Sequence, residues 1–110
     1  MGAILLLEKL LSKSILLIGT LDTKGAEYSY VCNLIKEHGH QTILLDVGIV
    51  GNPTLTANIN AATVAKAGGT TLARLRKQAD RGIAIEIMAT GATNLPLKLY
   101  AEGKVDGIFA

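Results

Sequence analysis

The sequence has little aromatic character: its 110 residues include three tyrosines, one phenylalanine and no tryptophan. Proteins that bind single-stranded nucleic acid without sequence preference stack the bases on aromatic side chains, so this composition argues against that class. Basic residues cluster in one segment only, at Arg74, Arg76, Lys77 and Arg81. We interpret this cluster as a solvated helix face, and we expect no nucleic-acid partner.

Cysteine is also scarce, since Cys32 is the only one in the chain. A single cysteine excludes an internal disulfide and a metal cluster built from cysteines. A cytoplasmic location is the simplest expectation. The apolar run 3–7 is far shorter than the roughly 20 residues of a membrane-spanning helix, so no membrane partner is expected.

Charged residues make up 18% of the sequence, below the roughly 25% of an average globular protein. Apolar residues make up 49%, which is enough to build a buried core. A low share of charge predicts that part of the surface is covered. The covering can come from self-association, from another domain, or from a missing remainder of the same domain.

The first half of the chain has the pattern of a βαβ unit. Residues 14–18 contain an unbroken apolar run, which is typical of a parallel strand that is covered on both faces. Residues 19–25 are expected to form a loop. Residues 26–38 have the apolar period of a helix, and residues 42–47 form a second buried strand. The sequence therefore predicts an α/β fold that begins a Rossmann-like parallel sheet.

The second half predicts two short helices over 60–67 and 71–78, and a long helix over 80–102. Apolar positions 85, 88, 92, 95 and 99 form one stripe on the long helix. A third strand begins at Val105, and the sequence stops inside it at Ala110. We therefore expect an incomplete domain, because the loop after a third strand is where doubly wound folds usually contact a ligand.

The segment 19–25 follows the first strand and carries groups that can bind an anion, namely Gly19, Thr20, Asp22, Thr23, Lys24 and Gly25. Gly19 allows a tight turn. Gly25 is expected to open the helix, whose first amides are free and partly positive. Lys24 adds a mobile positive charge. Asp22 can hold Mg²⁺ through water or cap the helix.

The glycine spacing matches neither a Walker loop nor a dinucleotide-binding loop. Two interpretations stay open for 19–25: a phosphate site, or an ordinary capped turn between strand and helix. Asp46 ends the second strand, where dinucleotide folds place an acid that binds ribose hydroxyls. A strand-end acid that lies in water or caps a turn is the alternative.

Four stretches are distinctive: GTLDTKG at 19–25, LDVG at 45–48, DRG at 80–82 and LYAEGKVDG at 99–107. Together they resemble the N-terminal ATP-binding domain of the tomato mosaic virus resistance protein and its uncharacterised bacterial and fungal relatives. The resemblance covers residues 14–110, the N-terminal part of a nucleotide-binding domain. Residues 1–13 lie outside it, as an artefact of the start site or an amphipathic extension.

The resemblance implies a larger protein in which two α/β subdomains hold ATP between them, and it implies self-association. It carries over the loop 19–25, Asp46 and Gly48 as nucleotide-side positions. The family continues past the position of Ala110 into a glycine-rich stretch that is expected to touch the phosphates.

We therefore predict an ATP-binding module, with or without Mg²⁺, that places the phosphates at 19–25. A protein-interaction or assembly module is one alternative, and the phosphate cradle of an uncharacterised enzyme is another. The sequence indicates no catalytic residue. It also indicates no metal site, because His38 and His40 lack a third ligand nearby.

Overall fold

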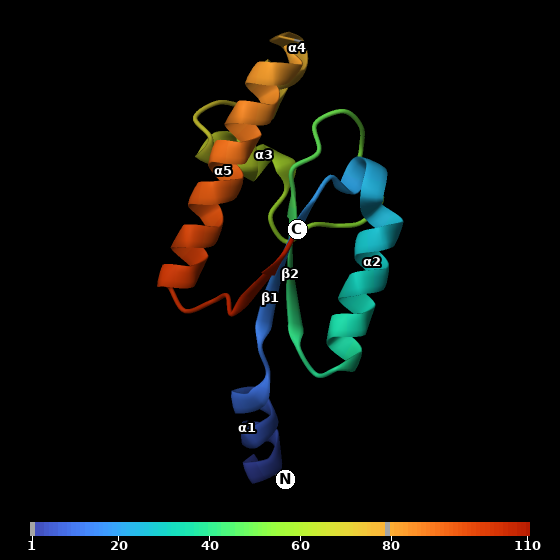
Figure 1. Cartoon of the computed structure of the whole chain (residues 1–110), viewed down its shortest axis with the longest axis vertical. Coiled ribbons are helices and arrows are strands. Elements are labelled where there is room, and N and C mark those ends of the chain that lie inside the picture. Colours follow the sequence, from blue (N-terminus) through green and yellow to red (C-terminus); the bar gives the residue numbers. More distant parts are fainter. Residues whose placement is uncertain (1, 79) are drawn as a thin grey trace.

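The computed structural model describes residues 2–78 and 80–110, and it shows the predicted α/β fold (Figure 1). The elements in chain order are α1 (Gly2–Leu11), β1 (Ser14–Gly19), α2 (Leu21–Glu37), β2 (Gln41–Asp46), α3 (Ala61–Ala67), α4 (Leu72–Gln78), α5 (Arg81–Ala101) and β3 (Gly107–Phe109). Helix α1 extends away from the sheet at the amino end of β1 (Figure 1).

The three strands form one parallel sheet in the order β2-β1-β3. Helix α2 covers one face of the sheet, and α3 and α5 cover the other (Figure 1). The apolar run of β1 follows from this position, because its side chains point alternately into two separate cores. Leu16 belongs to the core beneath α3 and α5, and Leu17 belongs to the core beneath α2.

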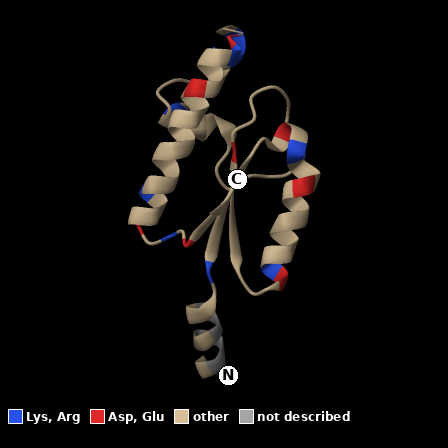
Figure 2. Cartoon of the chain, in the orientation of Figure 1, with Lys and Arg blue, Asp and Glu red and all other residues tan. Residues whose placement is uncertain are grey.

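The sheet is nearly free of charged residues, which lie mostly in the helices and connecting segments (Figure 2). Asp46 at the end of β2 is the exception within β1, β2 and β3. It is 2% exposed. Burying a carboxylate lowers the stability of the fold unless hydrogen bonds compensate for the lost water. Asp46 is therefore expected to have hydrogen-bond partners within the protein.

The two edges of the sheet differ. The outer edge of β2 is covered by the segment before α3, since Ile59 forms a parallel bridge with Leu45, and the Asn58 side chain accepts a hydrogen bond from the Leu44 amide at 2.7 Å. Strand β3 pairs with β1 on one side. Among the described residues, no strand pairs with its other side.

The stripe predicted for the long helix needs one correction. The buried positions of α5 are Ala84, Met88, Gly91 and Pro96. Ile85, expected on the same buried face, is 64% exposed. The reason is geometric, because α5 packs against α3 through its small residues, and this contact rotates Ile85 toward the carboxyl edge of the sheet.

The α3–α5 contact depends on Gly91. A Cβ at this position would overlap the backbone carbonyl of Val64 in α3. Backbone atoms cannot move aside as a flexible side chain can, so the two helices approach closely only because residue 91 has no side chain.

We expect Gly91→Ala to destabilise the chain by about 1–3 kcal/mol through overpacking of this contact. Gly82→Ala, in the first turn of the same helix, is the matched control, because its new Cβ would meet no atom closer than 3.5 Å. That control gains helix propensity of up to about 1 kcal/mol. Urea unfolding measures both, and equal stabilities for the two variants would contradict the packing argument.

Candidate functional site

The candidate site lies at the carboxyl edge of the sheet. Helix α2 connects β1 to β2 on one face, and α3, α4 and α5 connect β2 to β3 on the other. The first connection runs from β1 outward to β2, and the second returns from β2 past β1 to β3, so the direction of strand addition reverses at β1. Open α/β sheets bind ligands at such a topological switch point, outside the carboxyl ends of the strands.

The segment 19–25 is not a loop, contrary to the sequence prediction. Strand β1 includes Gly19, Thr20 is the N-cap, and α2 begins at Leu21 rather than at residue 26. Lys24 has non-helical dihedral angles (φ −119°, ψ 20°), which separate the first turn from the rest of the helix. Gly25 thus lies inside α2 instead of opening it. The interruption at Lys24 explains why the sequence lacks the helical period here.

Asp46 fixes the start of this first turn. Its Oδ1 accepts hydrogen bonds from the amides of Leu21 at 3.1 Å and Gly48 at 2.8 Å. Leu21 supplies the first free amide of α2, so a buried negative charge sits at the positive end of the helix. Binding of ribose by Asp46 remains a prediction. The structure shows a joint between β2, α2 and the following loop.

Asp22 has a different role from the two that the sequence suggested. Its Oδ2 accepts hydrogen bonds from the amides of Val50 at 3.1 Å and Gly51 at 3.0 Å. Thr20, not Asp22, is the N-cap of α2. Within the described residues, the buried Oδ1 of Asp22 has no hydrogen-bond partner. Asp22 therefore holds the loop after β2 against the start of α2.

Arg76 holds the same turn from the opposite side. Its Nε donates to the Ile49 carbonyl at 2.9 Å, and its Nη2 donates to the Gly51 carbonyl at 3.3 Å. The sequence analysis placed Arg76 on a solvated helix face. Its side chain is indeed exposed, but it also binds the loop, a contact that no local sequence signal reveals because 25 residues separate Arg76 from Gly51.

The three glycines carried over by the resemblance each make room for a side chain of the protein. A Cβ at Gly19 would clash with the Tyr28 ring, one at Gly25 with the Thr54 hydroxyl, and one at Gly48 with the Asp22 carboxylate. None of the three has a positive φ. Their absence of a side chain therefore serves packing around the site, and the tight turn expected at Gly19 does not need left-handed backbone.

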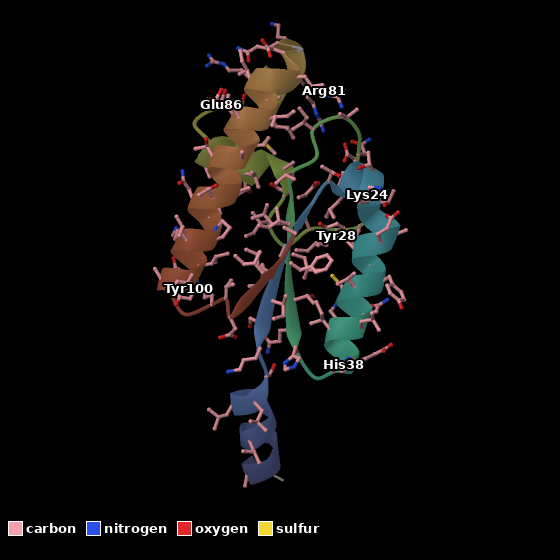
Figure 3. All side chains as sticks on the ribbon, in the orientation of Figure 1. Lys24, Tyr28, His38, Arg81, Glu86 and Tyr100 are labelled. Carbon is pink, nitrogen blue, oxygen red and sulfur yellow. The ribbon has the colours of Figure 1, made fainter. Side chains whose placement is uncertain are left out.

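Tyr28 connects α2 to the sheet through its hydroxyl and its ring. Figure 3 shows it pointing from α2 toward the sheet. Its hydroxyl donates to the Ile18 carbonyl, and its ring packs edge-on against Phe109 with centroids 5.8 Å apart. Burial raises the pKa of the Tyr28 hydroxyl. This residue links α2 to the ends of both β1 and β3.

Several polar groups of the first turn face solvent. The hydroxyls of Thr20 and Thr23 are hydrogen-bonded to each other at 2.8 Å, and the Thr20 side chain does not cap the helix. Lys24 is exposed (Figure 3), and no acid within residues 2–78 and 80–110 lies within ion-pair distance of it. Two hydroxyls, one ammonium and a helix start thus lie together on the surface.

Two clefts border this end of the sheet. One, of about 510 Å³, lies between the loop after β2 and the start of α5, and Arg76, Asp80 and Arg81 are among its lining residues. The other, of about 310 Å³, is apolar and includes Thr20 in its wall. Both volumes fall within the range of small-molecule sites.

The described residues do not form a metal centre. No group of three histidine, cysteine or acidic side chains gathers in the part of the chain that the structure describes. The unpartnered Oδ1 of Asp22 is buried and lies where a Cβ on residue 48 would be, so this oxygen is not open to a Mg²⁺ ion that approaches from solvent. Water-mediated binding by Asp22 remains a prediction.

Comparison with known protein families identifies the family of this chain. The sequence profile of the N-terminal domain of the uncharacterised protein family UPF0261 matches residues 13–110. The chain belongs to this family. No solved structure matches the chain. The likeness to the tomato mosaic virus resistance protein remains a prediction.

The relatives are bacterial UPF0261 proteins. One from Clostridium tetani is 39% identical over 100 residues, which cover 91% of this chain and 25% of the relative. One from Brucella suis is 38% identical over 99 residues, covering 90% and 24%. The chain thus spans about a quarter of the length of these relatives. No helix in residues 2–78 or 80–110 has the length and apolar content of a membrane span.

We expect Asp46→Ala to lower the free energy of unfolding by about 1–3 kcal/mol, because it leaves two buried amides unpaired. Asp106→Ala is the matched control. Asp106 also accepts a backbone amide, from Ser14 at 2.8 Å, but at an exposed position where water can replace it. Urea unfolding of both variants measures the difference. A cost for Asp46→Ala no larger than that for Asp106→Ala would show that the joint is not structural.

Proposed function

We propose that the chain is a nucleotide-binding module that takes the phosphates of ATP at the first turn of α2. Thr20, Thr23 and Lys24 are the contacting residues. The observation that carries the proposal is the exposed first turn itself, in which two hydroxyls and an ammonium group surround the amino end of a 17-residue helix. Helix starts of this kind favour phosphate, because their free amides and partial positive charge face the anion.

The neighbouring carboxylates limit how phosphate can bind. Asp46 takes the Leu21 amide, and Asp22 takes the amides of Val50 and Gly51. These donors are therefore occupied by protein oxygens. Among the described residues, the Asp22 amide has no such acceptor. The phosphates are consequently proposed to bind on the outer side of the turn, where Lys24 and the two hydroxyls lie.

We expect the chain to bind ATP, and Lys24→Ala to weaken this binding about tenfold or more, since the ammonium group offsets the phosphate charge. Lys36→Ala is the matched control, because Lys36 is an exposed lysine in the last turn of the same helix. Isothermal titration with ATP at low and high salt measures both variants.

Binding that falls equally in the two lysine variants would indicate a non-specific charge effect. Absence of ATP binding by both this chain and the full-length Clostridium tetani relative would overturn the proposal. Binding by the relative alone would mean that the remainder of the longer protein completes the site.

A second candidate function, assembly through the β3 side of the sheet, has its own observation. Strand β3 and the end of α5 expose large apolar side chains: Leu97 is 62% exposed, Tyr100 71% and Ile108 59%. A shallow cleft joins them along the unpaired edge of β3. Exposed apolar patches of this kind mark interaction surfaces, and an open strand edge can pair with another strand.

If β3 is an assembly edge, the chain associates in solution and Ile108→Lys shifts it toward the monomer, because a charge at the contact loses its water. Val50→Lys is the matched control, since Val50 is an exposed apolar residue in the loop after β2, the strand at the other edge of the sheet. Size-exclusion chromatography with light scattering gives the mass. A folded wild-type monomer at high concentration would count against assembly.

A further inference from the structure

The apolar cleft at the carboxyl edge is formed on the α5 face of the sheet. Its walls come from the end of β1, the residue after β2 and the middle of α5, and they comprise Ile18, Thr20, Val47, Ile85, Met88, Ala89 and Ala92. None of these side chains is charged, and Thr20 alone carries a hydrogen-bonding side chain. The volume of the cleft, about 310 Å³, is at the lower end of the range for ligand sites.

The position of the cleft follows from strand alternation. Leu16 and Ile18 point to the α5 face, and Thr20, two residues further, continues this face past the end of β1. Thr20 therefore belongs both to the cleft and to the exposed hydroxyl pair with Thr23. The cleft and the first turn of α2 are adjoining parts of one surface.

Ile85 gives an independent reason to regard the cleft as a site. It lies on the apolar stripe of α5, yet 64% of its surface is exposed. Its neighbour across one helical turn, Ala89, is also exposed and is small. On the side of α5 that faces the carboxyl edge, Ile85 thus projects as an apolar wall beside the small side chain of Ala89. The space above Ala89 leaves room for a flat apolar group.

We propose that this cleft receives the base of the nucleotide whose phosphates bind at Thr20, Thr23 and Lys24, an inference that rests on the proposed function. A purine has two apolar faces and a planar shape, and it would lie between Ile85 and Val47 over the Met88 thioether, which contacts aromatic rings favourably. The shared residue Thr20 sets the phosphate and base parts side by side.

The lining also determines the expected specificity. No carboxylate, amide or basic side chain lines the cleft to read the polar edge of a base. A site that holds a base through apolar contact discriminates weakly between bases, whereas a site built on hydrogen bonds discriminates strongly. We therefore expect ATP and GTP to bind with affinities within about tenfold of each other.

The decisive experiment uses the methyl group of Met88. The chain has two methionines, so a sample labelled at methionine methyl carbons gives two signals, which Met88→Leu assigns. ATP and adenosine are expected to shift the Met88 signal, because an aromatic ring placed over a methyl group changes its resonance. Tripolyphosphate, which has no base, is expected to bind without that shift.

Two variants alter the cleft at exposed positions where folding tolerates change. Ala89→Leu fills the cleft, and Ile85→Ala removes one of its walls. Each variant is expected to weaken ATP binding about tenfold and to leave the affinity for tripolyphosphate within about twofold of the wild-type value. Ala101→Leu, an exposed alanine of α5 that does not line the cleft, is the matched control and should bind both as the wild type does.

The outcomes separate this inference from the proposed function. Equal affinities for ATP and tripolyphosphate with an unmoved Met88 signal would overturn the base cleft and leave the phosphate site standing. Adenosine binding that Ala89→Leu abolishes, without any tripolyphosphate binding, would support the cleft and overturn the phosphate site. Failure of all three probes to bind to this chain and to the full-length Clostridium tetani relative would overturn both.

Discussion

The carboxylate of Asp46 is the interaction on which the carboxyl end of this structure depends. One buried oxygen accepts the first amide of α2 and the amide of Gly48, so a single side chain joins the end of β2, the start of α2 and the loop that follows β2. The charge is tolerated because it lies at the positive end of a helix and is hydrogen-bonded. This joint, together with the burial of Leu21 in the core beneath α2, fixes the first turn of α2 relative to the sheet.

A second carboxylate extends the same arrangement outward. Asp22 takes two amides of the turn 49–51, and Arg76 gives hydrogen bonds to two carbonyls of that turn. The loop is thereby held from both sides by opposite charges that come from α2 and α4. The carboxylates of Asp46 and Asp22 therefore accept hydrogen bonds from the amides around the first turn, and these amides are not free for a ligand. The outer side of the first turn and the adjoining apolar cleft remain open to one.

The two faces of β1 differ at the carboxyl edge of the sheet. The α2 face is closed by Tyr28, whose ring rests on Gly19 and against Phe109, so it is occupied by the protein itself. The α5 face remains open beyond Ile18, because Ala89 and Ala92 are too small to fill it. The unpaired edge of β3 is a further open feature of the described residues, and the relatives, of which this chain spans about a quarter, have further polypeptide that can cover it.

The sequence by itself determined the α/β class. The unbroken apolar run of β1 indicates a strand that is buried on both faces, and the helical period of α2 indicates a helix that is buried on one face. The helices predicted over 60–67 and 80–102 also begin close to where α3 and α5 begin, and in the structure Asn60 and Asp80 cap them, accepting amides at 2.9 and 3.0 Å. These features depend on neighbours in the chain and are therefore readable from it.

Only the tertiary structure decided what Gly19–Gly25 is and what surrounds it. The first turn of α2 is held by Asp46, which lies 25 residues from Leu21, so no local pattern reveals its helical state. Gly19 was expected to allow a tight turn and Gly25 to open the helix, but in the structure each makes room for a side chain, that of Tyr28 and that of Thr54. The cleft beside Thr20 exists because the α3–α5 contact sets the rotation of α5, and a one-dimensional stripe cannot specify that angle.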